Sequence, residues 1–185
     1  MTDRRQLLLD AAIRVLGTGG PRHLTHRAVD AEAGLPEGSA SNRFRTREAL
    51  VTGVFDRLVE VEALAWQRLA VDLPPGDVAA FAQVLGELIR EFTDQRRVVT
   101  LARYALFVEA AVRPDLRPAI EAGRARLAER GEPLLAALGS TDPPAHFRML
   151  LALIEGLLSN QLACPEDNFD PESAVAVLLR GFRAA

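Results

Sequence analysis

The stretch THRAVDAEAGLPEGSASNRFRTREAL, Thr25–Leu50, decides the fold. Its pattern predicts a short helix, a turn at Gly34, a second short helix that begins at Pro36, and a longer helix that begins after Thr46. The second short helix carries serine, asparagine and arginine side chains, with no acidic residue after Glu37. Such side chains suit contact with base edges and phosphates. The stretch therefore predicts a helix-turn-helix that binds DNA in the major groove.

Eight polar side chains of this stretch are candidates for contact with DNA. They are Thr25, Arg27, Ser39, Ser41, Asn42, Arg43, Arg45 and Arg47. We expect Asn42 and Arg43 to contact base edges, because asparagine pairs well with adenine and arginine with guanine. We expect Thr25, Arg45 and Arg47 to contact phosphates, and the backbone N–H of Arg47 lies at a helix start, which also favours a phosphate. A merely solvated charged face is the alternative, and the flanking helix-turn-helix pattern favours DNA contact.

Outside this stretch, apolar residues recur with helical spacing, and no segment alternates as a strand would. Leu9, Ala12, Ile13 and Leu16 predict a first helix that ends near Gly17. The helix after Thr46 should continue to about residue 71, where prolines interrupt the pattern. Further helices are predicted near 77–94, 96–112, 115–138, 144–163 and 171–183. The predicted fold class is all-α, with a three-helix DNA-binding domain over residues 1–50 and a helical domain over residues 51–185.

The predicted helices of the second domain differ in how much apolar surface they carry. The 96–112 helix is apolar nearly all round, so we expect it to be central. The helices near 144–163 and 171–183 have broad apolar faces. Two such faces at the end of a chain exceed what one subunit needs to cover, which predicts a homodimer that pairs through them.

Composition and charge narrow the class of protein. The 185 residues are 49% hydrophobic, and the single cysteine excludes an internal disulfide, in agreement with a reducing cytoplasm. No membrane span is expected, because the apolar-rich stretch 98–112 contains two charged residues and is shorter than the ~20 residues that a bilayer needs. Residues 1–57 hold nine Arg and seven Asp or Glu, a balance of +2, against −5 for the remainder. A basic head on an acidic body fits a DNA-binding module joined to a domain that stays off DNA.

Catalytic and metal-binding patterns are missing from the sequence. It shows no Ser/His/Asp constellation and no glycine-rich phosphate loop. His23 and His26 are three residues apart, but no cysteine or third histidine lies near them in sequence. We therefore expect no enzyme activity, no cofactor and no metal.

A set of aromatic and polar residues on the C-terminal helices could line an apolar ligand pocket. The candidates are Trp66, Phe92, Arg103, Tyr104, Phe107 and Phe147. Plain core packing is the alternative for each of them taken alone.

The N-terminal ~50 residues closely resemble the DNA-binding domain of the tetracycline-repressor (TetR) family. The resemblance rests on the helix LLLDAAIRVL, the turn GTGGPRHLT, the AVDAEAGL segment and GSASNRFRTREAL. A weaker resemblance covers RYALFVEAAVRPDLRPAIEAG, which is similar to a segment common in one branch of the family. The family is bacterial, all-helical and dimeric, and it typically represses transcription until a small molecule binds the C-terminal domain.

The resemblance implies roles for single residues. Gly38 and Ser39 match the start of the recognition helix, and Phe44 matches the aromatic residue that anchors this helix in the core. Arg47 stands where the family usually has a lysine beside the DNA backbone. Ser41 replaces the family's frequent tyrosine. Pro36 replaces the usual Ser/Thr cap, so this helix is expected to begin without a side-chain cap.

The sequence and the resemblance together predict a ligand-responsive homodimeric transcriptional regulator. The simplest form is a repressor that binds a palindromic operator through residues 25–44 until an unidentified small molecule releases it. Two alternatives stay open. One is a helical small-molecule-binding protein, and the other is an activator or ligand-independent regulator.

Overall fold

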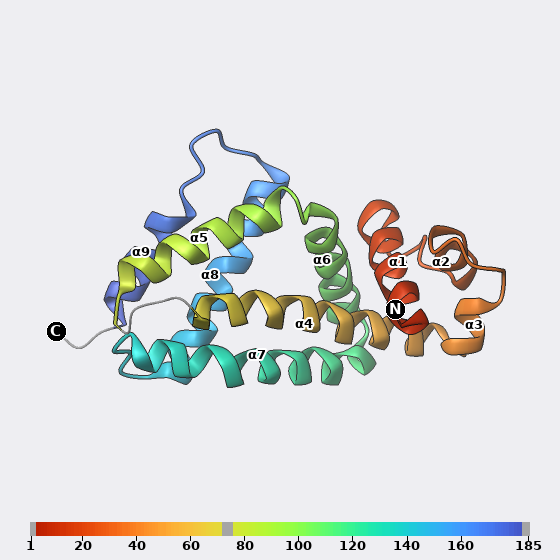
Figure 1. The fold of residues 1–185 in the computed structure, drawn as a ribbon, viewed down its shortest axis with the longest axis horizontal. Helices are drawn as coiled ribbons and strands as arrows, with labels where there is room; N and C mark the ends of the chain where they lie inside the picture. Colours follow the sequence, from red (N-terminus) through yellow and green to blue (C-terminus); the bar gives the residue numbers. More distant parts are fainter. Residues whose placement is uncertain (1–2, 72–75, 183–185) are drawn as a thin grey trace. The chain divides into compact units, whose positions relative to one another are not determined.

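The computed structural model describes residues 3–71 and 76–182, and Figure 1 shows how their helices follow one another. They form α1 (Arg4–Gly19), α2 (His26–Glu32), α3 (Ser39–Arg43), α4 (Arg47–Val71), α5 (Val78–Thr93), α6 (Arg97–Val112), the 3-10 helix η1 (Pro114–Leu116), α7 (Arg117–Ala137), α8 (Pro143–Ala163) and α9 (Pro171–Gly181). Within these ranges there is no β-strand. The prediction of an all-α fold is confirmed.

Side-chain caps begin several helices. The Thr25 hydroxyl oxygen accepts a hydrogen bond from the Ala28 amide at 3.1 Å, which begins α2. The Thr46 hydroxyl oxygen accepts one from the Ala49 amide at 3.1 Å at the start of α4. Each cap satisfies an amide that has no partner inside its helix, so these helix starts follow from local sequence.

The described chain divides into two compact units. One comprises residues 3–61 and 98–124, and the other comprises 62–71, 76–97 and 125–182. We call them the head unit and the body unit. The division differs from the predicted boundary after residue 50, because α6 and the first part of α7 pack with the N-terminal helices. Helix α4 contributes its first part to the head unit and its last part to the body unit.

The core of the head unit joins helices that are distant in sequence. The predicted stripe of α1, from Leu9 to Leu16, is buried. It packs in one cluster with Val29, Phe44 and Leu106, which come from α2, the end of α3 and α6. Burial of a side chain of this size contributes about 1.5–3 kcal/mol, so this cluster holds the short helices α2 and α3 in place.

Helix α6 is less buried than its composition suggests. It buries Thr100, Ala102, Leu106 and Ala110, whereas the side chain of Val108 is 69% exposed and that of Val112 is 78% exposed. The expectation of a central helix covered on all sides is therefore wrong for this single chain. Composition cannot decide the matter, because more than half of a typical protein surface is itself apolar.

The body unit is held together mainly by α5, α8 and α9. Helix α5 packs along α9 and α8, and an Arg90–Glu172 ion pair joins α5 to α9 at the surface. The Phe147 ring of α8 lies so close to Gly131 of α7 that a Cβ atom would not fit there. No helix in the described ranges is both long and apolar enough to cross a membrane.

Candidate nucleic-acid interface

The recognition helix α3 is short and begins later than predicted. It spans Ser39–Arg43, three residues after the expected start at Pro36. Residues 36–38 form a turn instead, in which the Ser39 amide donates to the Pro36 carbonyl at 3.2 Å. The turn passes through Gly38 at φ 92°, a left-handed conformation that glycine adopts without steric cost. The start predicted at Pro36 is therefore wrong.

Asp30 supplies the cap that α3 lacks in its own sequence. Its two carboxylate oxygens accept hydrogen bonds from the Gly38 amide at 2.8 Å and the Ala40 amide at 2.7 Å. The side chain is almost fully buried at 2% exposure. The expectation of an uncapped helix is thus corrected, because the cap comes from α2. A carboxylate beside Val29, on the apolar side of α2, was the available signal.

The outward side of α3 offers two unengaged polar side chains. Asn42 and Arg43 are exposed and make no side-chain hydrogen bond or ion pair with any residue of the described ranges. The Ser39 and Ser41 hydroxyls donate within the helix start, to the carbonyls of Pro36 at 2.7 Å and Gly38 at 3.1 Å. In this arrangement the two serines can only accept from a base, while asparagine can donate and accept and arginine can donate.

The two candidates at the start of α2 keep capacity for a phosphate. The Thr25 oxygen accepts from the Ala28 amide, which leaves its own O–H as a donor. The Arg27 Nε lies 3.3 Å from a Glu37 carboxylate oxygen, but both side chains are largely exposed, at 85% and 78%. Exposed pairs of this kind contribute about 0–1 kcal/mol, so a DNA phosphate can replace Glu37 at little cost.

Arg45 and Arg47 differ although only one residue separates them. Arg45 is exposed and has no ion-pair partner in the described ranges. Arg47 donates to Glu109 of α6 at 2.7 Å and to the Pro21 carbonyl at 2.9 Å. Its side chain would have to leave Glu109 to reach a phosphate. Phosphate contact by Arg47 therefore stays a prediction that carries an added cost.

Glu109 belongs to a small charged network behind the interface. Its side chain is 11% exposed, and one of its oxygens lies 2.7 Å from Arg47 and 3.5 Å from Arg113. Arg113 also pairs with Asp115 at 2.7 Å and holds the pKa of that carboxyl below its ordinary value by hydrogen bonding. The pKa of Glu48 is lowered first by a bond from its own backbone amide and then by Thr46 and Arg113. The network joins the start of α4 to the end of α6.

The candidate pocket residues fall into both units. In the body unit, the Trp66 and Phe147 rings pack edge to face with centroids 5.2 Å apart, and Phe92 lies beneath the Arg96 guanidinium at 5.5 Å. In the head unit, the Arg103 guanidinium lies 5.2 Å from both the Tyr104 and the Phe107 ring centroids. Some of the predicted residues therefore contact one another in each unit: Trp66 contacts Phe147 in the body unit, and Arg103 contacts Tyr104 and Phe107 in the head unit. A single pocket lined by all six residues stays a prediction.

The histidine pair shows no metal-site geometry. His23 bonds through Nδ1 to the Gly19 carbonyl, and the Nε2 atom of His26 is buried. The described residues contain no group of three or more His, Cys, Asp or Glu side chains that could hold a metal ion.

Comparison with known proteins assigns the chain to a family. The family model for the bacterial regulatory proteins of the tetR family matches residues 8–54, and the model for the tetracyclin repressor-like C-terminal domain matches residues 76–185. The chain belongs to the TetR family. TetR-family proteins are transcriptional regulators that bind DNA and respond to ligands, so this chain is a regulator and not an enzyme.

Solved TetR-family structures resemble the whole chain. A family member from Streptomyces coelicolor is 32% identical, with a TM-score of 0.73, over 98% of this chain and 99% of that one. The multidrug binding protein EbrR, complexed with ethidium, is 32% identical, with a TM-score of 0.72, over 97% and 98%. A TetR-family regulator from Rhodococcus shares the fold over the full length of both chains at 20% identity and a TM-score of 0.80. No curated protein matches the chain.

Proposed function

We propose that this chain is a homodimeric, cytoplasmic repressor that binds a palindromic operator through two copies of α3 and leaves it when an aromatic small molecule binds. The observation that carries the DNA-binding part is the outward side of α3, where Asn42 and Arg43 are exposed and unengaged. The two α3 helices of a dimer would enter successive major grooves about 34–36 Å apart.

The dimer is proposed to form through α8 and α9 of the body unit. Met149 on α8 is 53% exposed and Val177 on α9 is 64% exposed. Along α8, Ala152 and Gly156 are exposed one turn apart, and nothing lies within 4 Å of the place of a Cβ on Gly156. Small residues beside large exposed apolar ones let a second pair of helices approach closely and cover them.

The DNA-binding part is tested by gel shift with the DNA upstream of the chain's own gene at low salt. We expect a shifted band for the wild type and at least tenfold weaker binding for Asn42→Ala and Arg43→Ala, because each removes a base contact. Arg130→Ala is the control, since Arg130 is exposed on α7 and pairs with no carboxylate in the described ranges. Equal binding by all four proteins would contradict the assignment of α3.

The dimer is tested by sedimentation of Gly156→Arg at micromolar concentration. An arginine at this position would hold two α8 helices apart, so we expect a shift from dimer to monomer with the thermal stability of each subunit's head unit retained. Ala136→Arg introduces the same side chain on an exposed position of α7 and should remain dimeric. A Gly156→Arg protein that stays dimeric would place the interface elsewhere.

The effector is proposed to bind beside Trp66 in the body unit. EbrR, at 32% identity, was solved with ethidium, and at 34% identity with malachite green. Both are aromatic compounds, which suit the edge-to-face aromatic pair of Trp66 and Phe147. Binding there would reach the head unit through α4, whose two parts belong to the two units. Such coupling typically amounts to about 1–3 kcal/mol.

Trp66 is the only tryptophan, so its fluorescence reports this site directly. We expect ethidium to quench Trp66 saturably and to weaken DNA binding over the same concentration range. Phe147→Leu should weaken quenching and release together. Quenching without any effect on DNA binding would mean that ethidium binds beside Trp66 but does not regulate DNA binding.

A further inference from the structure

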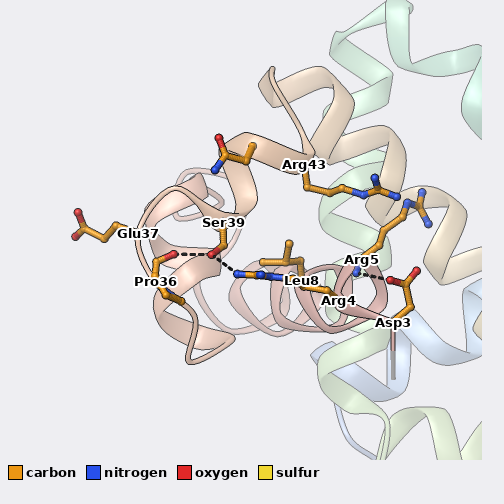
Figure 2. A pocket seen from close by; sticks show the side chains of 9 residues that line it. Asp3, Arg4, Arg5, Leu8, Pro36, Glu37, Ser39 and Arg43 are labelled. Atoms are coloured by element: carbon orange, nitrogen blue, oxygen red, sulfur yellow. Dashed lines mark hydrogen bonds between the residues drawn. The ribbon is translucent and has the colours of Figure 1, made fainter. Parts of the chain in front are cut away.

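The start of α1 and the recognition helix enclose an open hollow of about 550 Å³ within the head unit. Arg4 and Arg5 line it from α1, and Ser39, Asn42 and Arg43 line it from α3. Figure 2 shows the side chains of Arg5 and Arg43 extending to the same side of this hollow, with Arg4 reaching Ser39. We call it the arginine hollow.

The three arginines of the hollow have no carboxylate partner within the described ranges. Arg4 donates through Nη2 to the Ser39 hydroxyl at 3.1 Å, and the Arg5 guanidinium lies 6.0 Å from the Phe44 ring centroid. Several other arginines of the head unit are paired. The Arg57 guanidinium, for example, donates a hydrogen bond to the Asp10 carboxylate at 2.8 Å, and this bond raises the pKa of Arg57. Like charges gathered without a counter-charge repel one another, so an anion in the hollow would be favoured.

The two acidic residues of the rim are engaged elsewhere. Asp3 caps α1 by accepting a hydrogen bond from the Arg5 backbone amide at 3.1 Å. Glu37 pairs with Arg27 at 3.3 Å, and Figure 2 shows its side chain pointing away from Arg5 and Arg43. Neither carboxylate forms an ion pair with the arginines of the hollow, so their guanidinium groups keep unused N–H donors.

We propose that the arginine hollow is the seat of one phosphodiester group of the DNA backbone, beside the groove that Asn42 and Arg43 contact. This inference rests on the proposed DNA-binding function and adds to it a contact from α1. Guanidinium groups match the geometry of phosphate oxygens and bind them with two parallel hydrogen bonds. Arg4 gains a second role, because its bond to Ser39 ties the first residue of α3 to the bound phosphate.

The test measures the salt dependence of binding to a fluorescein-labelled DNA duplex of mixed sequence, so that no operator is needed. For each phosphate that a protein neutralises, the slope of log affinity against log salt concentration changes by about 0.9. We expect the Arg4→Ala, Arg5→Ala double variant to lose about 0.9 in slope per subunit relative to the wild type. Arg130→Ala should retain the full slope, and Arg4→Lys, Arg5→Lys should recover most of it because the charges are kept.

Two readouts separate this inference from its alternatives. Arg4 is exposed, so Arg4→Ala alone serves if the double variant unfolds in a circular dichroism melt. On the upstream DNA that the wild type shifts, a single neutral methylphosphonate, moved along the strand, should weaken wild-type binding at a defined position and leave the double variant unaffected there. Wild-type binding with an unchanged slope in both alanine variants overturns the phosphate seat and leaves the proposed function intact. Failure of the wild type to bind any duplex refutes the proposed function itself.

A free anion is the competing occupant of the hollow. If inorganic phosphate raises the melting temperature of the wild type but not of the double variant, at matched ionic strength, while the salt slopes agree, the hollow binds a small anion and not DNA. That result also overturns the inference.

Discussion

The arginines around α3 and the arginine at the start of α4 differ in whether another residue of the chain binds them. Around α3, Arg43 and Arg45 are exposed without a carboxylate partner in the described ranges. At the start of α4, Arg47 is held by a mostly buried Glu109 and the Pro21 carbonyl. Arg43 and Arg45 therefore remain accessible to a partner outside the chain, whereas Arg47 takes part in the contacts that join α4 to α6. Charge at a surface therefore indicates a binding role only where the chain itself leaves it unpaired.

The largest effect is expected from a substitution that removes the cap of α3. Asp30→Ala leaves the part-buried Gly38 amide and the buried Ala40 amide without acceptors. Since a hydrogen bond to a charged group contributes about 1.5–3 kcal/mol, we expect the free energy of unfolding to fall by about 2–4 kcal/mol. Urea denaturation measures this. Asp30→Asn keeps one acceptor and should fall between, whereas equal stability of all three proteins would show that the cap is dispensable.

Alanine substitution at Arg43 and Arg47 should separate the two sets of arginines. Arg47→Ala leaves Glu109 with only its longer contact to Arg113, so we expect a loss of about 1–2 kcal/mol in unfolding free energy. Arg43→Ala should change stability by less than about 0.5 kcal/mol and weaken DNA binding at least tenfold. Thermal melts and anisotropy on the same samples check both. If the two variants behave alike, the distinction drawn from their pairing is wrong.

A variant that releases Arg47 from Glu109 tests whether Arg47 can contact DNA. Glu109→Gln removes the charge that holds the Arg47 guanidinium but keeps the shape of the side chain. If Arg47 can then reach a phosphate, the salt slope of duplex binding should steepen by about 0.9 per subunit. The matched control is Glu60→Gln, which neutralises an exposed partner of Arg57 on α4 instead. An unchanged slope in Glu109→Gln would mean that Arg47 contributes structure only.

Low pH should slightly reduce the stability contributed by Glu48 and Asp115 in the head unit. The pKa values of Glu48 and Asp115 are lowered in the folded protein, so protonation of either carboxyl is disfavoured by folding. Their contribution to stability is present above their ordinary values of 4.5 and 3.8 and is lost as pH falls through the lowered values. Both groups are exposed, so the effect is small. Urea melts of the wild type and of Glu48→Gln, Asp115→Asn should show a weaker acid dependence in the double variant.

The helices and the caps at Thr25 and Thr46 could be predicted because they depend on neighbours a few residues away. Thr25 and Thr46 cap amides three residues along, and the α1 stripe from Leu9 to Leu16 repeats at the helical period. The start of α3 could not be predicted. Its cap is Asp30, which comes from another helix, and its turn depends on a left-handed Gly38.

By itself, the sequence determined an all-helical regulator with a polar, arginine-bearing α3, since periodicity, caps and motif spacing are local properties. Only the tertiary structure decided which of the described arginines are engaged with other residues of the chain. Arg47 and Glu109 are 62 residues apart, and only packing brings α6 against the start of α4. The same packing sets Arg4 against Ser39, 35 residues away, and leaves the three arginines of the hollow without an ion-pair partner among the described residues.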